Sequence, residues 1–83
     1  MSKQLYIGNL SPKADDAALK ALFSMFGAVE KAYVVLDKQT RQSKGFGFVV
    51  MSNEAEAQAA IDTLNGKKVG EYTVKVQETK AKG

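Results

Sequence analysis

The chain contains no cysteine and no histidine. Without cysteine it can form neither disulfide bonds nor thiolate metal sites, and without histidine it lacks the usual transition-metal ligand and the usual general base. Most enzymatic mechanisms therefore lose the side chains on which they depend. We expect no catalytic residues, no metal site, no cofactor and no small-molecule substrate.

Long apolar runs are missing as well. No run approaches the length of a membrane span, and residues 1–10 lack the basic, apolar and small-residue layout of a signal peptide. These absences predict a cytoplasmic protein, or a nuclear one if the source is eukaryotic, with no membrane partner.

Low-complexity runs and long polar tracts, which would suggest disorder, are also absent. Hydrophobic residues make up 45% and charged residues 25% of the 83 residues, which are ordinary values for a globular domain. A chain of this length forms one domain with one hydrophobic core. We expect a single domain over residues 1–83, with its core in residues 4–77 and a flexible tail at 78–83, that acts as a monomer.

The most informative stretch is Lys44–Met51, with the sequence KGFGFVVM. Read as a strand, its side chains alternate between two faces, and both faces are apolar. The chain has only two convincing helical segments, which can cover only one face of a sheet. Phe46 and Phe48 are then left on the uncovered face, beside Lys44 and two glycines that let a ligand approach. Exposed aromatic side chains in this setting are typical of surfaces that stack on unpaired nucleic-acid bases.

Hydrophobic periodicity predicts the order strand, helix, strand, strand, helix, strand. Asp15 is a good N-cap for the first helix and Gly27 ends it, while Asn53 and Glu56 resemble a capping box at the start of the second. The predicted strands are residues 4–8, 28–36, 44–51 and 72–77, the helices are residues 15–26 and 53–64, and residues 67–71 form a turn or short hairpin.

This order predicts an α+β fold of the ferredoxin-like split βαβ type (βαββαβ). In that fold a four-stranded antiparallel sheet carries both helices on one face, and the first and third strands lie side by side at its centre. Tyr6, Phe46 and Phe48 then become neighbours on the open face. We call these three residues the aromatic platform.

Charge is distributed unevenly among the predicted elements. The two predicted helices hold five acidic residues and one basic residue, Lys20, a net charge of minus four. Since the whole chain is plus three, the strands, loops and termini carry plus seven. The loop at 37–43 contributes Lys38 and Arg41 beside the platform. Positive charge gathered away from the helices indicates a surface along which a phosphate backbone runs.

Two sequence signatures support a family resemblance. Seven of the eight residues Lys44–Met51 match the first signature of the RNA recognition motif family, and the exception, Met51, is expected to point into the core. Leu5–Leu10 matches the second signature near the N-terminus, where the family places it. Residues 4–77 therefore resemble the RNA recognition motif family, and most resemble its small single-domain members found in bacteria.

The resemblance implies binding of single-stranded RNA on the sheet. Tyr6 and Phe48 match the stacking positions of the family, Phe46 matches the position that packs against sugars, and Lys44 matches the basic position that contacts phosphate. The full set of predicted RNA-binding residues is Gln4, Tyr6, Asn9, Lys31, Tyr33, Arg41, Lys44, Phe46, Phe48, Thr73, Lys75 and Gln77.

Four positions outside the signature aromatics bear on the interface. Gly8 and Asn9 match the end of the first strand, where an approaching base needs space and a polar edge. Glu71 lies in a turn where many relatives have a basic contact, and its charge would repel phosphate. Tyr33 is either an ordinary edge aromatic favoured by strand propensity or an extra stacking position beyond Phe46.

Other readings stay open beside RNA binding. Some domains of this fold bind proteins, and unrelated split βαβ domains include small enzymes such as acylphosphatases. A protein-binding version is expected to lose the aromatic platform or to bury it beneath an added helix. An enzyme would need a nucleophile, an acid–base pair or a metal cluster. Single-stranded DNA is an alternative ligand to RNA.

Overall fold

The computed structural model of the protein describes residues 3–79. Its helices and strands follow the predicted order, and the short hairpin predicted at residues 67–71 is present but extends to Thr73. The helices are α1 (Asp16–Ser24) and α2 (Glu54–Leu64), and the strands are β1 (Lys3–Gly8), β2 (Val29–Leu36), β3 (Ser43–Met51), β4 (Lys68–Val69), β5 (Tyr72–Thr73) and β6 (Lys75–Thr79).

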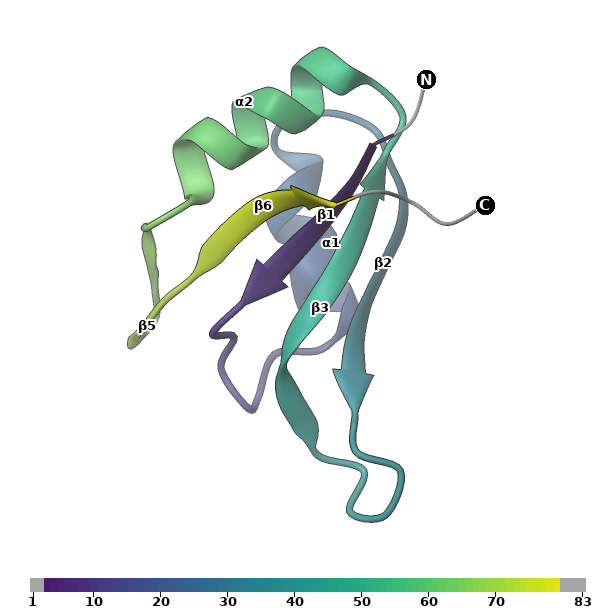
Figure 1. Ribbon diagram of the computed structural model, residues 1–83, viewed down its shortest axis with the longest axis vertical. Coiled ribbons are helices and arrows are strands. Elements are labelled where there is room, and N and C mark those ends of the chain that lie inside the picture. Colours follow the sequence, from purple (N-terminus) through teal and green to yellow (C-terminus); the bar gives the residue numbers. More distant parts are fainter. Residues whose placement is uncertain (1–2, 80–83) are drawn as a thin grey trace.

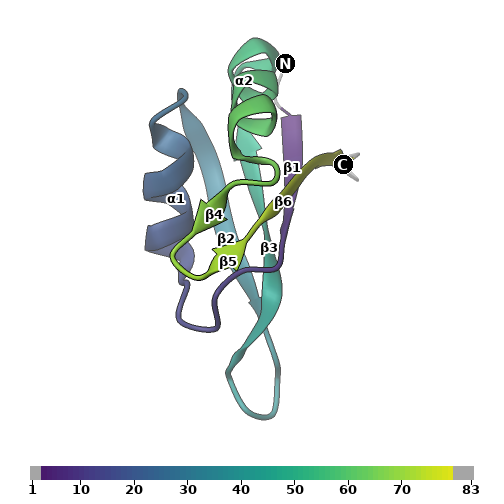
Figure 2. The same cartoon turned by 90° about the vertical axis from the view of Figure 1, so that its left-hand side faces the viewer.

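Four of the strands form an antiparallel sheet in the order β2-β3-β1-β6. The first and third strands of the chain therefore lie side by side at the centre, and β2 and β6 are the edges (Figure 1). Helix α1 packs against β2 and α2 against β6, and both helices lie on the same face of the sheet (Figure 2). This arrangement confirms the predicted split βαβ fold.

Helix α1 begins where the sequence predicts. The side chain of the N-cap Asp15 accepts a hydrogen bond from the backbone N–H of Ala18, which satisfies one of the free amides of the first turn. Leu19 and Phe23 are one turn apart and are buried against the sheet. The helix ends at Ser24, two residues before the predicted end.

Helix α2 is capped differently from the prediction. The Asn53 side chain accepts from the backbone N–H groups of Ala55 and Glu56, as expected of an N-cap. Glu56 does not complete the predicted capping box: its Oε1 accepts from the backbone N–H of Ala28, at 3.3 Å, and so connects α2 to the segment before β2. Gly27 lies against this carboxylate, and a Cβ at that position would collide with the Glu56 side chain.

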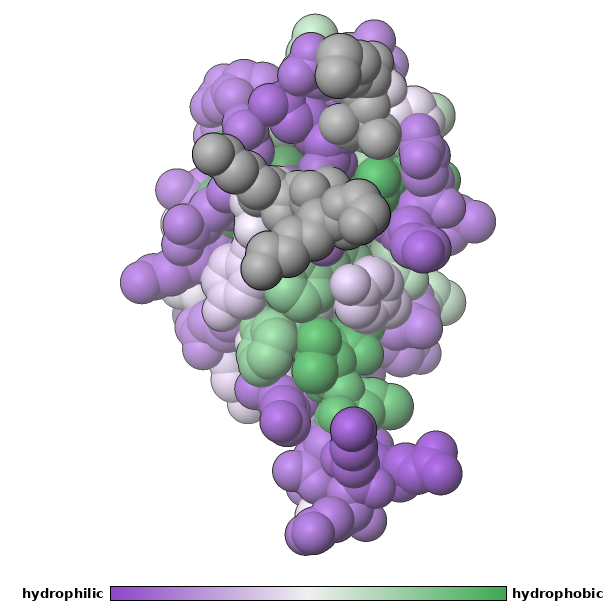
Figure 3. All heavy atoms as spheres, turned by 45° about the vertical axis from the view of Figure 1, so that its right-hand side comes forward, coloured by the Kyte–Doolittle hydropathy of each residue, from purple (hydrophilic) through white to green (hydrophobic). Residues whose placement is uncertain are grey.

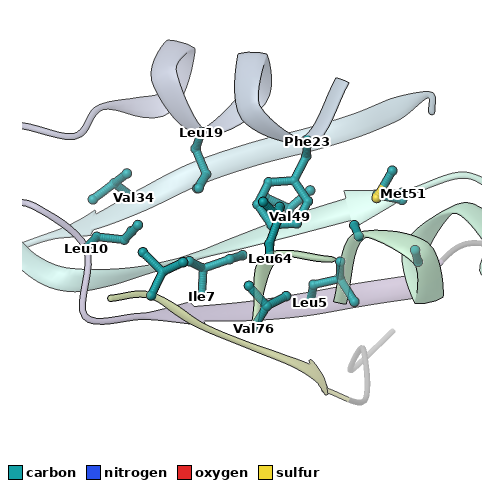
Figure 4. Close-up of a cluster of buried hydrophobic side chains, with 13 residues drawn as sticks. Leu5, Ile7, Leu10, Leu19, Phe23, Val34, Val49, Met51, Leu64 and Val76 are labelled. Atoms are coloured by element: carbon teal, nitrogen blue, oxygen red, sulfur yellow. The ribbon is translucent and has the colours of Figure 1, made fainter. Parts of the chain in front are cut away.

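The core lies between the helices and the inner face of the sheet. In Figure 4, Leu19 and Phe23 point from α1 toward the strands. The interior is wholly apolar in the described part of the chain. The buried residues are Leu5, Ile7, Leu10, Leu19, Phe23, Val34, Val49, Met51, Ala57, Ala60, Leu64, Val74 and Val76.

Gly47 on β3 lies where neighbouring elements approach it closely. It is buried, and a Cβ built on it would lie 2.5 Å from the carbonyl oxygen of Tyr33 and 3.1 Å from Cδ2 of Leu19. Strand β2 and helix α1 therefore meet β3 at a distance that only glycine permits.

The predicted last strand, residues 72–77, is wrong at both ends. Tyr72 and Thr73 belong to β5, which pairs with β4 through a two-residue turn whose first residue, Gly70, has φ of +65°. A glycine at that position is typical of a type II′ hairpin turn. The backbone of Val74 then exchanges hydrogen bonds with the Gly66 N–H and the Lys67 carbonyl, so the sheet strand starts only at Lys75.

Strand β6 continues beyond the predicted end of the core. Glu78 and Thr79 pair with Leu5 and Gln4 of β1. These two residues therefore belong to the sheet and not to a flexible tail. The rest of the predicted tail, 80–83, lies outside the described residues.

Candidate nucleic-acid interface

The aromatic platform forms on the open face of the sheet as predicted. Tyr6 lies directly opposite Phe48, with ring centroids 5.8 Å apart, and its ring lies 5.9 Å from that of Phe46. Phe46 and Phe48 lie 6.3 Å apart with their planes at 89°. These are favourable tilted and edge-to-face contacts. Each ring is half-buried because it packs against the other two, which leaves a firm apolar surface facing solvent.

Tyr33 extends this surface to the edge of the sheet. It lies opposite Phe48 on β2, with ring centroids 5.6 Å apart, and 38% of the residue is exposed. The expectation that it would lie beyond Phe46 is wrong, because the pairing register places it across from Phe48. Four aromatic rings are thus in continuous contact.

The register arranges the open face in rows that cross the strands. Directly paired residues share a face, so each row runs from one sheet edge toward the other. The middle row is Tyr33, Phe48, Tyr6 and Gln77; one neighbouring row is Lys31, Val50, Gln4 and Thr79; the other contains Phe46, Gly8 and Lys75. Figure 3 shows an apolar area on this face, with the hydrophilic loop between β2 and β3 at its lower end.

Thr79 also faces outward on the open face, opposite Gln4, although the sequence pattern predicts a tail at residues 78–83 and Thr79 is not among the predicted RNA-binding residues. Val74 and Val76 are both buried, so the outward alternation reaches Lys75, Gln77 and Thr79 in turn. Following that alternation two residues further would have found it.

Gly8 and Asn9 make contacts within the protein that the sequence did not predict. A Cβ on Gly8 would lie 3.0 Å from Cε2 and from the hydroxyl oxygen of Tyr6, so the absence of a side chain at Gly8 makes room for the tyrosine ring. Asn9 has φ of 60°, and its Nδ2 donates to the Thr73 carbonyl at 2.7 Å. Its amide nitrogen therefore anchors the β4–β5 hairpin to the end of β1.

Thr73 does not lie on the four-stranded sheet. It pairs with Lys68 in the β4–β5 hairpin, beside the end of β1. The predicted position on the open face is therefore wrong, because the hairpin takes residues 72–73 out of the last sheet strand.

The loop between β2 and β3 carries exposed basic residues at one end of the platform. Lys38, Arg41 and Lys44 are all exposed. Asp37, at the start of the loop, has its pKa lowered below the ordinary value by hydrogen bonds from the backbone of Gln39 and Thr40, and further by the charge of Lys44.

Lys3 is engaged at the opposite end of β1. Its Nζ lies 2.9 Å from a carboxylate oxygen of Glu78 and 3.3 Å from one of Glu54. Hydrogen bonds to Glu78 and then to Glu54 raise the pKa of Lys3 above its ordinary value. Lys3 is therefore paired with carboxylates at one end of β1. The basic residues Lys38, Arg41 and Lys44 lie at the other end of the sheet, in and beside the β2–β3 loop.

A four-stranded sheet with two helices on one face and a row of aromatic side chains on the other defines a split βαβ domain with an open aromatic face. Residues 5–75 match the sequence profile of the RNA recognition motif. The chain therefore belongs to the RNA recognition motif family.

Individual relatives agree with this assignment. The chain is 44% identical over 79 residues to a 29 kDa chloroplastic ribonucleoprotein of Arabidopsis thaliana, covering 95% of this chain and 23% of that protein. It is also 44% identical to oligouridylate-binding protein 1 of Nicotiana plumbaginifolia, covering 86% of this chain and 18% of that protein. The chain thus spans about a quarter or less of these two relatives.

Among solved structures, the crystal structure of the RNA-binding protein PG1 is similar over the whole domain. The TM-score is 0.94 at 33% identity, with 98% of each chain covered.

No helix in residues 3–79 is long and apolar enough to cross a membrane.

Proposed function

We propose that this domain binds single-stranded RNA on the open face of its sheet. The observation that carries the proposal is the continuous contact of Tyr6, Phe46 and Phe48 on the face that the helices leave uncovered. Family membership supports it, as do the names of the relatives, which include a ribonucleoprotein and an oligouridylate-binding protein.

The family resemblance assigns a role to each ring of the platform. In this proposal bases stack on Tyr6 and Phe48, which are paired in the middle row, and Phe46 packs against the sugar between two nucleotides. Gln77 lies beside Tyr6 on β6, where its amide can donate to and accept from a base edge. The remaining polar and basic contacts are proposed for Gln4, Asn9, Lys31, Arg41, Lys44, Thr73 and Lys75.

Asn9 and Thr73 have a smaller share in this proposal than the sequence predicted. The Asn9 amide nitrogen donates to the Thr73 carbonyl, so a contact from Asn9 to RNA uses its carboxamide oxygen. Thr73 would reach the ligand from the hairpin beside the sheet, and not from the sheet itself.

A protein-binding role and an enzymatic role find less support. Within residues 3–79 both helices pack on the far side of the sheet, and the four aromatic rings remain accessible. Membership of the RNA recognition motif family points to a non-enzymatic role in binding RNA.

We further propose that the domain is a cytoplasmic monomer. An organelle is the alternative location, because some relatives are named as chloroplastic or mitochondrial.

The direct test is titration of the protein with unstructured RNA and DNA oligonucleotides of the same sequence. We expect saturable binding with a preference for RNA. Equal affinity for both would identify a general single-strand binder, and no binding to either at physiological salt would contradict the proposal.

Lys44→Ala is expected to weaken binding about equally for all RNA sequences, because a phosphate contact carries no sequence information. The dependence of log affinity on log salt should become shallower by roughly 0.7 for the lost contact. Lys20→Ala, on the exposed surface of α1, is the control and removes the same charge from the helix side. Equal losses from the two variants would show diffuse electrostatic attraction without a preferred face.

Tyr33→Ala tests whether the fourth ring extends the binding site. Because Tyr33 lies at the β2 edge, next to Phe48, a real stacking position is reached only by RNA long enough to continue past Phe48. Affinity should then fall by roughly 1 to 3 kcal/mol for long oligonucleotides and stay unchanged for short ones. Unchanged affinity at every length would leave Tyr33 as an ordinary surface aromatic.

A further inference from the structure

The loop between β2 and β3 is closed by its own backbone. The N–H of Asp37 donates to the carbonyl of Gln42 at 2.8 Å, and the N–H of Arg41 donates to the carbonyl of Asp37 at 2.9 Å. Leu36 and Ser43 pair just before and after it. Both the donor and the acceptor of the Asp37 backbone are therefore used to hold the two ends of the loop together.

The Asp37 side chain organises the inside of the same loop. Its Oδ1 accepts from the N–H of Gln39 at 2.8 Å and from the N–H of Thr40 at 3.1 Å. One residue thus makes four hydrogen bonds to four different residues of a six-residue loop. The bonds that lower its pKa are the same bonds that shape the loop.

Arg41 is held in an unfavourable conformation within this loop. Its φ is +65°, in the left-handed region that residues other than glycine rarely adopt. Such a conformation persists only when surrounding interactions enforce it, and it is often found at functional sites. The Arg41 N–H donates to the Asp37 backbone carbonyl, and the N–H of the preceding residue, Thr40, donates to the Asp37 carboxylate, so the Asp37 side chain helps to hold the segment that carries Arg41.

We propose that Asp37 is a positioning residue for RNA binding, which holds the loop so that Arg41 is presented to the phosphates of an RNA lying on the aromatic platform. The loop joins β3 at Ser43, only three residues before Phe46, and Lys44 lies between the loop and Phe46 on the same strand. This inference rests on the proposed function, because a positioning role requires an RNA ligand on this face.

Charge and positioning predict opposite effects of removing the carboxylate. Asp37 is a negative charge beside three basic residues, so electrostatics alone predicts that its loss strengthens binding to a polyanion. If Asp37 positions the loop, losing its acceptor leaves the loop to be ordered at the moment of binding, which weakens the complex. Asp37→Asn and Asp37→Ala separate the two effects, because both remove the charge but only asparagine keeps the acceptor.

The experiment compares these variants with the parent protein in titrations with an oligouridylate probe at constant salt. We expect Asp37→Asn to bind as tightly as the parent or more tightly, and Asp37→Ala to bind roughly threefold to tenfold more weakly. In a protein that also carries Arg41→Ala, the loss of affinity caused by Asp37→Ala should shrink below about twofold. The reason is that the effects of substituting two residues that act together are not additive. Amide hydrogen exchange at Gln39 and Thr40 should accelerate in Asp37→Ala only.

Two results would overturn the inference. One is that Asp37→Ala binds as tightly as Asp37→Asn, which would show that only the charge matters. The other is an undiminished penalty in the Arg41→Ala background, which would show that Asp37 does not act through Arg41. Phe48→Ala is measured in parallel: if it leaves affinity unchanged, the proposed platform site itself has failed. If Asp37→Ala does not fold, Asp37→Ser takes its place, because serine keeps one acceptor. The RNA affinity of Asp37→Ser must then lie between the affinities of the parent and of the Arg41→Ala protein.

Discussion

Replacing Phe48 with alanine is expected to weaken binding of single-stranded RNA by roughly 1 to 3 kcal/mol, the size of one base-stacking contact. Phe48 lies at the centre of the aromatic cluster, where its ring contacts those of Tyr6, Tyr33 and Phe46. The loss therefore removes a stacking surface and also leaves the neighbouring rings less well supported. Affinity is measured by titration with a fluorescent oligonucleotide.

The fold should survive this substitution because Phe48 faces away from the core. Circular dichroism and the thermal midpoint of the variant check that point. Val50→Ala is a matched control, since Val50 lies two residues further along the same face of β3 and is not aromatic. An intact Phe48→Ala protein with affinity within twofold of the parent would show that the platform is not the binding surface.

Gly47→Ala is expected to destabilise the fold strongly, although it adds only one methyl group. The new Cβ would lie 2.5 Å from the Tyr33 carbonyl oxygen and 3.2 Å from the Cα of Val34, both of which are backbone atoms of β2. Backbone atoms cannot move aside as a flexible side chain can, so β2 and β3 must separate. Overpacking typically costs 1 to 3 kcal/mol, and we expect about 3 kcal/mol or more here. Urea denaturation with the parent as reference measures the change.

Gly8→Ala provides the comparison for this prediction. The three atoms nearest to its Cβ would all belong to the Tyr6 side chain, at 3.0 to 3.3 Å, and that side chain can tilt toward solvent. We expect a smaller loss of stability and, because Tyr6 shifts, weaker RNA binding. If Gly47→Ala proved as stable as Gly8→Ala, the close approach of β2 to β3 would not be a constraint on the sequence at Gly47.

Most of the fold follows from local patterns that can be read along the chain. Alternation places Phe46 and Phe48 on one face of β3 and Val49 and Met51 on the other, whichever strands lie beside it. Asp15 marks the start of its helix because it caps amides only three residues ahead. The aromatic platform was predictable because the order of helices and strands admits few sheet topologies, and in the split βαβ arrangement the first and third strands are neighbours.

Interactions between distant residues depend on the folded chain. The partners of Glu56 and of Asn9 are 28 and 64 residues away, so nothing near them in the sequence indicates that they anchor other segments. Tyr33 meets Phe48 because the β2–β3 register, with its bulges, places them opposite each other, and a shift of one residue would turn Tyr33 to the other face. The divided last strand has the same cause, since the backbone of Val74 bonds to residues 66–67 and competes with the local strand pattern. Periodicity and capping act over a few residues and are visible in the sequence, whereas register and long-range hydrogen bonds depend on which segments the packed core brings together.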